Sequence, residues 1–282
     1  MEKLKQLMAG ALVLLFSTAV FAETVPRARR GITLDQGVTE IGLEFTMGLN
    51  AGGAADAWSI GQGIPDGFIA LDRDARPGAY PGISLTGYEH KRHTGFTTAY
   101  GITDDVEIGL ALNAINFERV RDTKGHVTNN AEIGGGEVYV TYGFLPFMGV
   151  ELGILVPGED LADRRIGMRL GIPINLPLVE DVLSISLRED MEFYFVKGGP
   201  TIQSFTDIGI TVSPIHEFYM EAFVGFRYGV SSPHGDARIP LGLLVGGNPL
   251  PTVDLGVAFT FGDLLGHGAD ARSLTFAAAF RF

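Results

Sequence analysis

Apolar and polar side chains alternate with a period of two along most of this chain. Between residues 39 and 49, apolar residues stand at positions 41, 43, 45, 47 and 49, and polar residues or glycines stand between them. Successive side chains of a β-strand point to opposite faces, so the pattern predicts a strand with one apolar face. The alternation lasts about ten residues, the length of a tilted strand that crosses a membrane.

Six further runs alternate in the same way, and weaker candidates bring the number of predicted strands to twelve. We expect them at residues 39–49, 84–101, 105–117, 131–145, 149–157, 165–176, 181–195, 201–213, 217–229, 238–248, 251–262 and 272–282. In the strand at 181–195, Glu189 falls on the apolar face. Either a β-bulge near Arg188 turns this side chain inward, or the register predicted for the strand is wrong.

Short connections with proline or aspartate alternate with longer ones along the chain. Short turns at one rim and longer loops at the other are typical of outer-membrane β-barrels, with the short turns in the periplasm. The predicted fold is therefore an all-β, transmembrane, antiparallel up-and-down β-barrel of about 12 strands over residues 39–282. The long outer loop at 50–81 holds the only tryptophan, Trp58. It either folds into the lumen as a constriction or stays outside as an external loop.

The first residues predict export. Lys3 and Lys5 precede an apolar stretch at 7–21 that ends in Ala22, which indicates a secretory signal peptide over 1–22 cleaved after Ala22. Residues 23–38 are then a periplasmic N-terminal segment. This segment either plugs the barrel from below or forms a flexible tail.

Composition excludes several classes of protein. Hydrophobic residues make up 46% of the chain, yet beyond the N-terminus no apolar run is long enough for a membrane-spanning helix. A net charge of −12 disfavours nucleic-acid binding, which needs a basic surface. The chain has no cysteine for a disulfide or a thiolate metal site. It also shows no phosphate loop, nucleotide fingerprint or metal-ligand spacing, so we predict no cofactor and no metal.

Two segments resemble known proteins. The last residues alternate up to a terminal phenylalanine, and this ending resembles the C-terminal assembly signal of bacterial outer-membrane proteins; the signal residues are Phe276, Phe280 and Phe282. The resemblance implies insertion into outer-membrane lipid by the barrel assembly machinery, with periplasmic chaperones as partners.

Residues 100–110 resemble a strand-turn-strand phrase of the outer-membrane transporter family associated with the meta-pathway of phenol degradation. That resemblance implies uptake of small, hydrophobic or aromatic compounds.

Charged residues gather on the predicted inward faces, where we expect them to line the lumen and set its selectivity. They are Glu40, Glu44, Glu107, Glu137, Glu151, Asp207, Glu221, Asp254, Arg169, Arg188, Arg227 and Arg281. Rings of one charge bias ion selectivity, so the excess of acids favours cationic or neutral solutes. Alternatively, these charges pair across the lumen and plug it. We also expect the inward glycines to leave room inside, and twelve strands to allow a narrow pore.

The predicted function is therefore an outer-membrane channel or transporter for passive passage of small solutes, and not an enzyme. One alternative is a barrel enzyme that acts on lipid, of the phospholipase or lipid A deacylase type. His90 and His93 are its best candidates for a general base, although no serine is paired with them. The other alternative is a structural barrel with a sealed lumen.

Overall fold

The computed structural model describes residues 31–49, 55–60, 96–112, 115–121, 127–132, 136–156, 164–196, 199–229, 239–261, 264 and 272–282. Within these ranges, no helix is long and apolar enough to cross a membrane. The strands are β1 (Thr39–Leu49), β2 (Ala55–Ile60), β3 (Phe96–Thr103), β4 (Val106–Leu112), β5 (Ile115–Arg121), β6 (Val127–Glu132), β7 (Gly136–Leu145), β8 (Met148–Val156), β9 (Arg164–Val179), β10 (Leu183–Val196), β11 (Gly199–Ile215), β12 (Phe218–Gly229), β13 (Leu241–Leu250), β14 (Val253–Phe261) and β15 (Arg272–Arg281).

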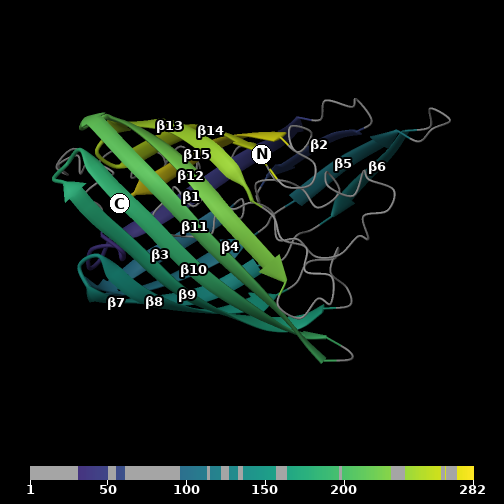
Figure 1. The fold of residues 1–282 in the computed structure, drawn as a ribbon, viewed down its shortest axis with the longest axis horizontal. Coiled ribbons are helices and arrows are strands. Elements are labelled where there is room, and N and C mark those ends of the chain that lie inside the picture. Colours follow the sequence, from purple (N-terminus) through teal and green to yellow (C-terminus); the bar gives the residue numbers. More distant parts are fainter. Residues whose placement is uncertain are drawn as a thin grey trace, which may run out of the picture.

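Twelve of these strands close into a barrel (Figure 1). Around the barrel the order is β1, β3, β4, β7, β8 and then β9 to β15, and every pair of neighbours is antiparallel. The circle closes where β15 pairs with β1, from Glu40 opposite Arg281 to Leu49 opposite Arg272. Thr39 and Phe282 also exchange two backbone hydrogen bonds, so β1 begins and β15 ends at the same rim. The predicted twelve-stranded, antiparallel barrel is confirmed.

The other three strands, β2, β5 and β6, extend one end of the barrel beyond the closed wall (Figure 1). β2 pairs with β1 at Thr46 and Met47, and along its whole length with β5. The predicted loop at 50–81 therefore contains a strand, which its sequence did not indicate. The backbone edges that β1 and β5 present here need hydrogen-bond partners, and β2 supplies them. The predicted strand at 84–101 is observed from Phe96 onward as β3; residues 84–95 lie outside the described residues.

The two faces of the barrel wall differ as the alternation predicted. The outward face carries apolar side chains with high exposure, such as Leu152 (57%) and Ile166 (59%). The inward face carries buried polar residues, glycines and alanines, together with larger buried side chains such as Tyr139, Phe223 and Leu244. An outer surface of this kind suits contact with hydrocarbon, where every backbone polar group must be paired within the barrel.

The N-terminal segment 31–38 lies against the inner wall at the rim of short turns. Leu34 donates its backbone N–H to Glu107 of β4 (3.0 Å), and Gln36 donates its N–H to Asp104 in the β3–β4 turn (2.9 Å). Gly37 has a φ of +82°, a left-handed conformation that glycine adopts readily, and it turns the chain into β1. This segment thus reduces the opening at that rim; residues 23–30 lie outside the described residues.

Strand β10 contains a charged residue on the outer face. The pairing of β10 with β9 and β11 is regular through Arg188 and Glu189, so the expected bulge is absent there. The predicted register holds, and Glu189 faces outward between Leu187 and Met191. Its carboxylate accepts hydrogen bonds from the hydroxyls of Ser204 (2.7 Å) and Thr206, which also face outward from β11. These hydroxyls, rather than a change in direction of the strand, accommodate the charge.

We expect the substitution Glu189→Leu to raise the free energy of unfolding by about 1–2 kcal/mol, because a carboxylate on the lipid face is costly near the middle of the bilayer. Ser204→Ala should instead lower it by about 1 kcal/mol, since one carboxylate oxygen loses its donor. Urea-induced unfolding in lipid vesicles measures both effects, with Met191→Leu on the same face as a nearly neutral control. A destabilised Glu189→Leu variant would show that the polar group is required there.

Candidate lumen site

Inward glycines provide the space for large side chains from the neighbouring strands. A Cβ atom added at Gly109 of β4 would lie 2.1 Å from the ring of Tyr139, which stands opposite on β7. The same arrangement recurs around the wall: Gly153 lies under Glu137, Gly167 under Tyr194, Gly171 under Asp190, Gly209 under Glu221, Gly225 under Asp207, Gly242 under Phe223 and Gly246 under Tyr219. We expected the inward glycines to leave open space in the lumen, but neighbouring side chains occupy the space over these glycines. The glycines allow long side chains to lie flat along the wall.

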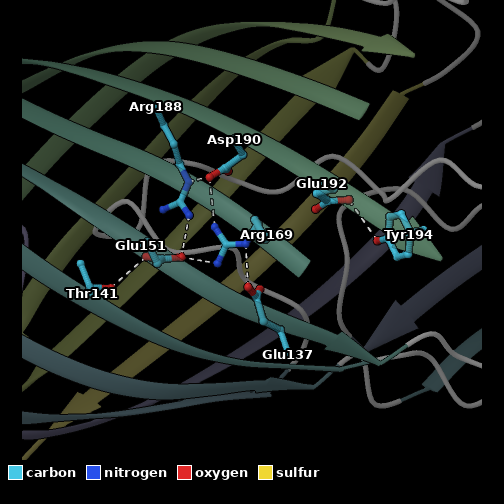
Figure 2. A network of polar contacts seen from close by, with 8 residues as sticks. All are labelled: Glu137, Thr141, Glu151, Arg169, Arg188, Asp190, Glu192 and Tyr194. Atoms are coloured by element: carbon cyan, nitrogen blue, oxygen red, sulfur yellow. Dashed lines mark hydrogen bonds and ion pairs between the residues drawn. The ribbon is translucent and has the colours of Figure 1, made fainter. Parts of the chain in front are cut away.

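One charged cluster occupies the inner wall of β7 to β10, with Arg169 of β9 at its centre (Figure 2). Its guanidinium group donates to Glu137 of β7 (2.6 Å), to Asp190 of β10 (3.1 Å) and to Glu151 of β8. Arg169 is 1% exposed, so these carboxylates replace the water that the cation has lost.

A second arginine completes this cluster. Arg188 of β10 donates to Glu151 (2.8 Å) and to Asp190 (2.7 Å), and the hydroxyl of Thr141 on β7 donates to the other oxygen of Glu151 (3.0 Å). Glu151 and Asp190 are each shared between the two arginines. Three carboxylates and two guanidinium groups thus cross-link four neighbouring strands, and we call this group the Arg169 cluster.

A smaller cluster lies where the barrel closes. Arg281 of β15 donates to Glu40 of β1 (2.9 Å) and to Asp254 of β14 (2.7 Å). Glu40 and Asp254 are buried, while the side chain of Arg281 is 15% exposed. The cluster ties together the first strand of the chain and the last two.

The remaining predicted lumen residues are distributed around the wall. Glu107, Asp207, Glu221 and Glu44 are all buried on the inward face of their strands. Glu107 binds the N-terminal segment, and the carboxylates of Asp207 and Glu221 lie over glycines of neighbouring strands. The side chain of Arg227 lies outside the described residues.

Several inward polar residues of the described wall were missing from the predicted set. Asp190 belongs to the Arg169 cluster, Glu192 accepts a hydrogen bond from Tyr194 (3.0 Å), and Thr97 of β3 is buried. The alternation contained the signal for the first two, since positions 188, 190 and 192 share a face opposite the apolar residues of β10. Because Glu189 stands on the opposite face of β10, the acids of this strand do not all lie on one face, and Asp190 and Glu192 were not assigned to the lumen.

The two clusters run along the wall rather than across the lumen. The ion pairs of the Arg169 cluster and of Arg281 join strands that are at most two places apart around the barrel. They do not support the alternative in which these charges plug the lumen by pairing across it. The near-complete burial of the inward side chains nevertheless means that any passage beside them is narrow.

The described residues include no group of three side chains that could hold a metal ion. His90 and His93, the candidate bases of the enzyme alternative, lie outside the described residues.

The residues of the predicted assembly signal lie on β15 and just after it, and Phe276 and Phe282 are exposed at 42% and 40%.

A closed antiparallel barrel with an apolar outer face and a polar inner wall belongs to the class of transmembrane β-barrels. The chain matches no protein-family model and no curated protein. Among solved structures it resembles the COG4313 outer membrane channel from Pseudomonas putida F1, with a TM-score of 0.53 and 10% identity over 89% of this chain and 97% of that chain. The KdgM porin in complex with disordered oligogalacturonate gives a TM-score of 0.47 and 10% identity, over 86% of this chain and 99% of that chain. The translocator domain of the autotransporter NalP from Neisseria meningitidis gives a TM-score of 0.45 and 9% identity, over 99% of this chain and 96% of that chain.

Proposed function

We propose that this protein is a narrow outer-membrane channel through which small solutes pass passively. The observation that carries the proposal is that the ion pairs of the two clusters join nearby strands of the wall and do not cross the lumen. They hold the arginines and carboxylates against the wall. This arrangement supports the proposal, because pairing along the wall does not seal the lumen in the way that pairing across it would. Burial of the inner wall sets the size of the passage and favours small solutes over general diffusion of larger ones.

The charge of the inner wall gives the channel a preference. Ten buried carboxylates on the described inward face stand against the guanidinium groups of Arg169, Arg188 and the half-buried Arg281. This excess of negative charge favours cationic and neutral solutes. The resemblance of residues 100–110 to the phenol-pathway transporter family adds small hydrophobic or aromatic compounds to the solutes to be tested.

The same proposal covers the route to the membrane. Residues 1–22 are removed as a signal peptide, and the barrel assembly machinery recognises the strand that ends in Phe276, Phe280 and Phe282. The exposed positions of Phe276 and Phe282 on the outer face support this role, because a docking factor can reach them there.

We expect refolded protein in planar bilayers to show small, discrete conductance steps. In a potassium chloride gradient, the reversal potential should have the sign of a cation-selective pore, because carboxylates outnumber arginines on the inner wall. An absence of both current and solute flux would favour the structural barrel. Lipid hydrolysis that disappears in the His93→Ala variant would favour the enzyme.

A further inference from the structure

Glu44 of β1 is a buried carboxylate for which the described part of the chain supplies no hydrogen-bond partner. It points inward and is 3% exposed, yet neither of its oxygens makes a hydrogen bond. The paired carboxylates of the Arg169 cluster and of Arg281 show how this barrel normally accommodates a buried charge. An unpaired buried carboxyl group is costly in either protonation state, because the acid form also lacks partners for its oxygens and its proton.

Thr97 of β3 is a second unpartnered polar group on the same stretch of wall. Its hydroxyl oxygen makes no hydrogen bond to any described residue, and Thr97 is also 3% exposed. Thr97 stands opposite Gly42 of β1, and Glu44 is two residues farther along β1 on the same inward face. Such diagonal neighbours have Cα atoms about 7–8 Å apart, and their side chains can reach a common ligand.

Most of the described inward neighbours of these two residues are small; the exception is Glu40, four residues before Glu44 on β1, which bonds to Arg281. On β15, Ala277 stands opposite Glu44, and Ala279 and Thr275 flank it on the inward face. On the other side, Ala99 follows Thr97 on β3 and Ala111 stands opposite it on β4. Among the described residues, the wall here therefore offers three unpaired oxygen atoms beside several small side chains.

The chemistry of these oxygens matches a primary ammonium group. An R–NH3⁺ group has three N–H donors, and the two carboxylate oxygens of Glu44 and the hydroxyl of Thr97 supply three acceptors. Calcium or magnesium needs six or more oxygen ligands, and zinc prefers histidine or cysteine, so this pair suits a metal poorly. The surrounding alanines accommodate the carbon part of a small amine.

We propose that Glu44 and Thr97 form a binding site for the ammonium group of a small aliphatic amine inside the barrel. The inference deepens the proposed function, on which it rests, by naming a class of permeant solute. The amine enters along the lumen, and its ammonium group exchanges hydrogen bonds with water for hydrogen bonds with the three oxygens of this site. It leaves the site when water takes these hydrogen bonds back.

Propylammonium is the probe, and the full-length refolded protein is the sample. In planar bilayers we expect propylammonium to interrupt the potassium current in a concentration-dependent way, while propanol and propionate at the same concentrations do not. Glu44→Gln should weaken this interaction at least tenfold, because it removes a charge-assisted hydrogen bond. Thr97→Val should weaken it by about threefold to tenfold and leave the charge of the wall unchanged.

Glu189→Gln is the matched control, because it makes the same chemical change on the outer face and should leave the interaction unaltered. Calorimetric titration of propylammonium into the detergent-solubilised protein tests binding without any current. A current that propylammonium interrupts equally in wild type and Glu44→Gln would overturn the site and leave the channel standing. A barrel that carries no current but binds propylammonium through Glu44 would overturn the proposed function and leave the site standing.

Discussion

The substitution Arg169→Met should lower the free energy of unfolding by roughly 3–5 kcal/mol, the largest effect that we expect from a single change in this barrel. Arg169 bonds to Glu137, Glu151 and Asp190 from a position that is 1% exposed. Without it, Glu151 and Asp190 keep only Arg188, and Glu137 loses the guanidinium group that binds it. Urea-induced unfolding of the protein refolded into lipid vesicles, followed by tryptophan fluorescence and by gel mobility, measures the loss.

Two further variants give this prediction its controls. Arg281→Met removes a guanidinium group that binds two carboxylates at the seam, but Arg281 is 15% exposed, so water can replace part of its contribution and the loss should be smaller. The double variant Arg169→Met/Glu151→Gln should be more stable than Arg169→Met alone, because one uncompensated charge is gone. Equal stability of wild type and Arg169→Met would mean that the cluster contributes nothing to the barrel.

The substitution Gly101→Ala should displace the N-terminal segment 31–38 from the inner wall. A Cβ atom at Gly101 would lie 2.1 Å from the backbone oxygen of Asp35 and 2.7 Å from that of Leu34, and backbone atoms cannot move aside as a flexible side chain can. Overpacking of this kind costs about 1–3 kcal/mol. The amides of Leu34, Gln36 and Gly37 should therefore exchange hydrogen roughly tenfold to a hundredfold faster, as hydrogen-exchange mass spectrometry would show.

Gly143→Ala is the matched control for this change. Gly143 faces inward beneath the same segment, but its added Cβ would lie 3.7 Å from the Thr33 hydroxyl, an ordinary contact. Exchange in segment 31–38 should remain at the wild-type rate in Gly143→Ala. We also expect a larger conductance in Gly101→Ala, because the segment reduces the opening at the rim of turns. Unchanged exchange in Gly101→Ala would show that the segment is not held against β3.

The strand at β10 illustrates which features the sequence could predict. Its alternation correctly assigned Leu187 and Met191 to the outer face, because side-chain direction in a strand follows from local geometry alone. Neither alternative offered for Glu189, a bulge near Arg188 or a wrong register, is observed, since hydrogen-bond partners can also accommodate a charge on the apolar face. Those partners, Ser204 and Thr206, belong to the next strand, so the register between β10 and β11 had to be known before they could be identified.

Strand β2 illustrates a limit of a different kind. Residues 55–60 carry no clear alternation, and they form a strand because the edges of β1 and β5 lie on either side of them. A single sequence does not show which edges will be left without a partner, because that depends on where each strand ends in space.

The period-two alternation was enough to predict a closed barrel with an apolar outer face and acids inside, since it records which side of each strand meets lipid. The three-dimensional fold was needed to show which charges meet. Arg281 and Glu40 are 241 residues apart, and they are neighbours because the last strand pairs with the first in one particular register. The registers of other strand pairs set Tyr139 over Gly109 and join Arg169 to three strands, while the described residues give Glu44 no hydrogen-bond partner. A strand's face is a local property, whereas its neighbours are chosen by the closure of the whole sheet.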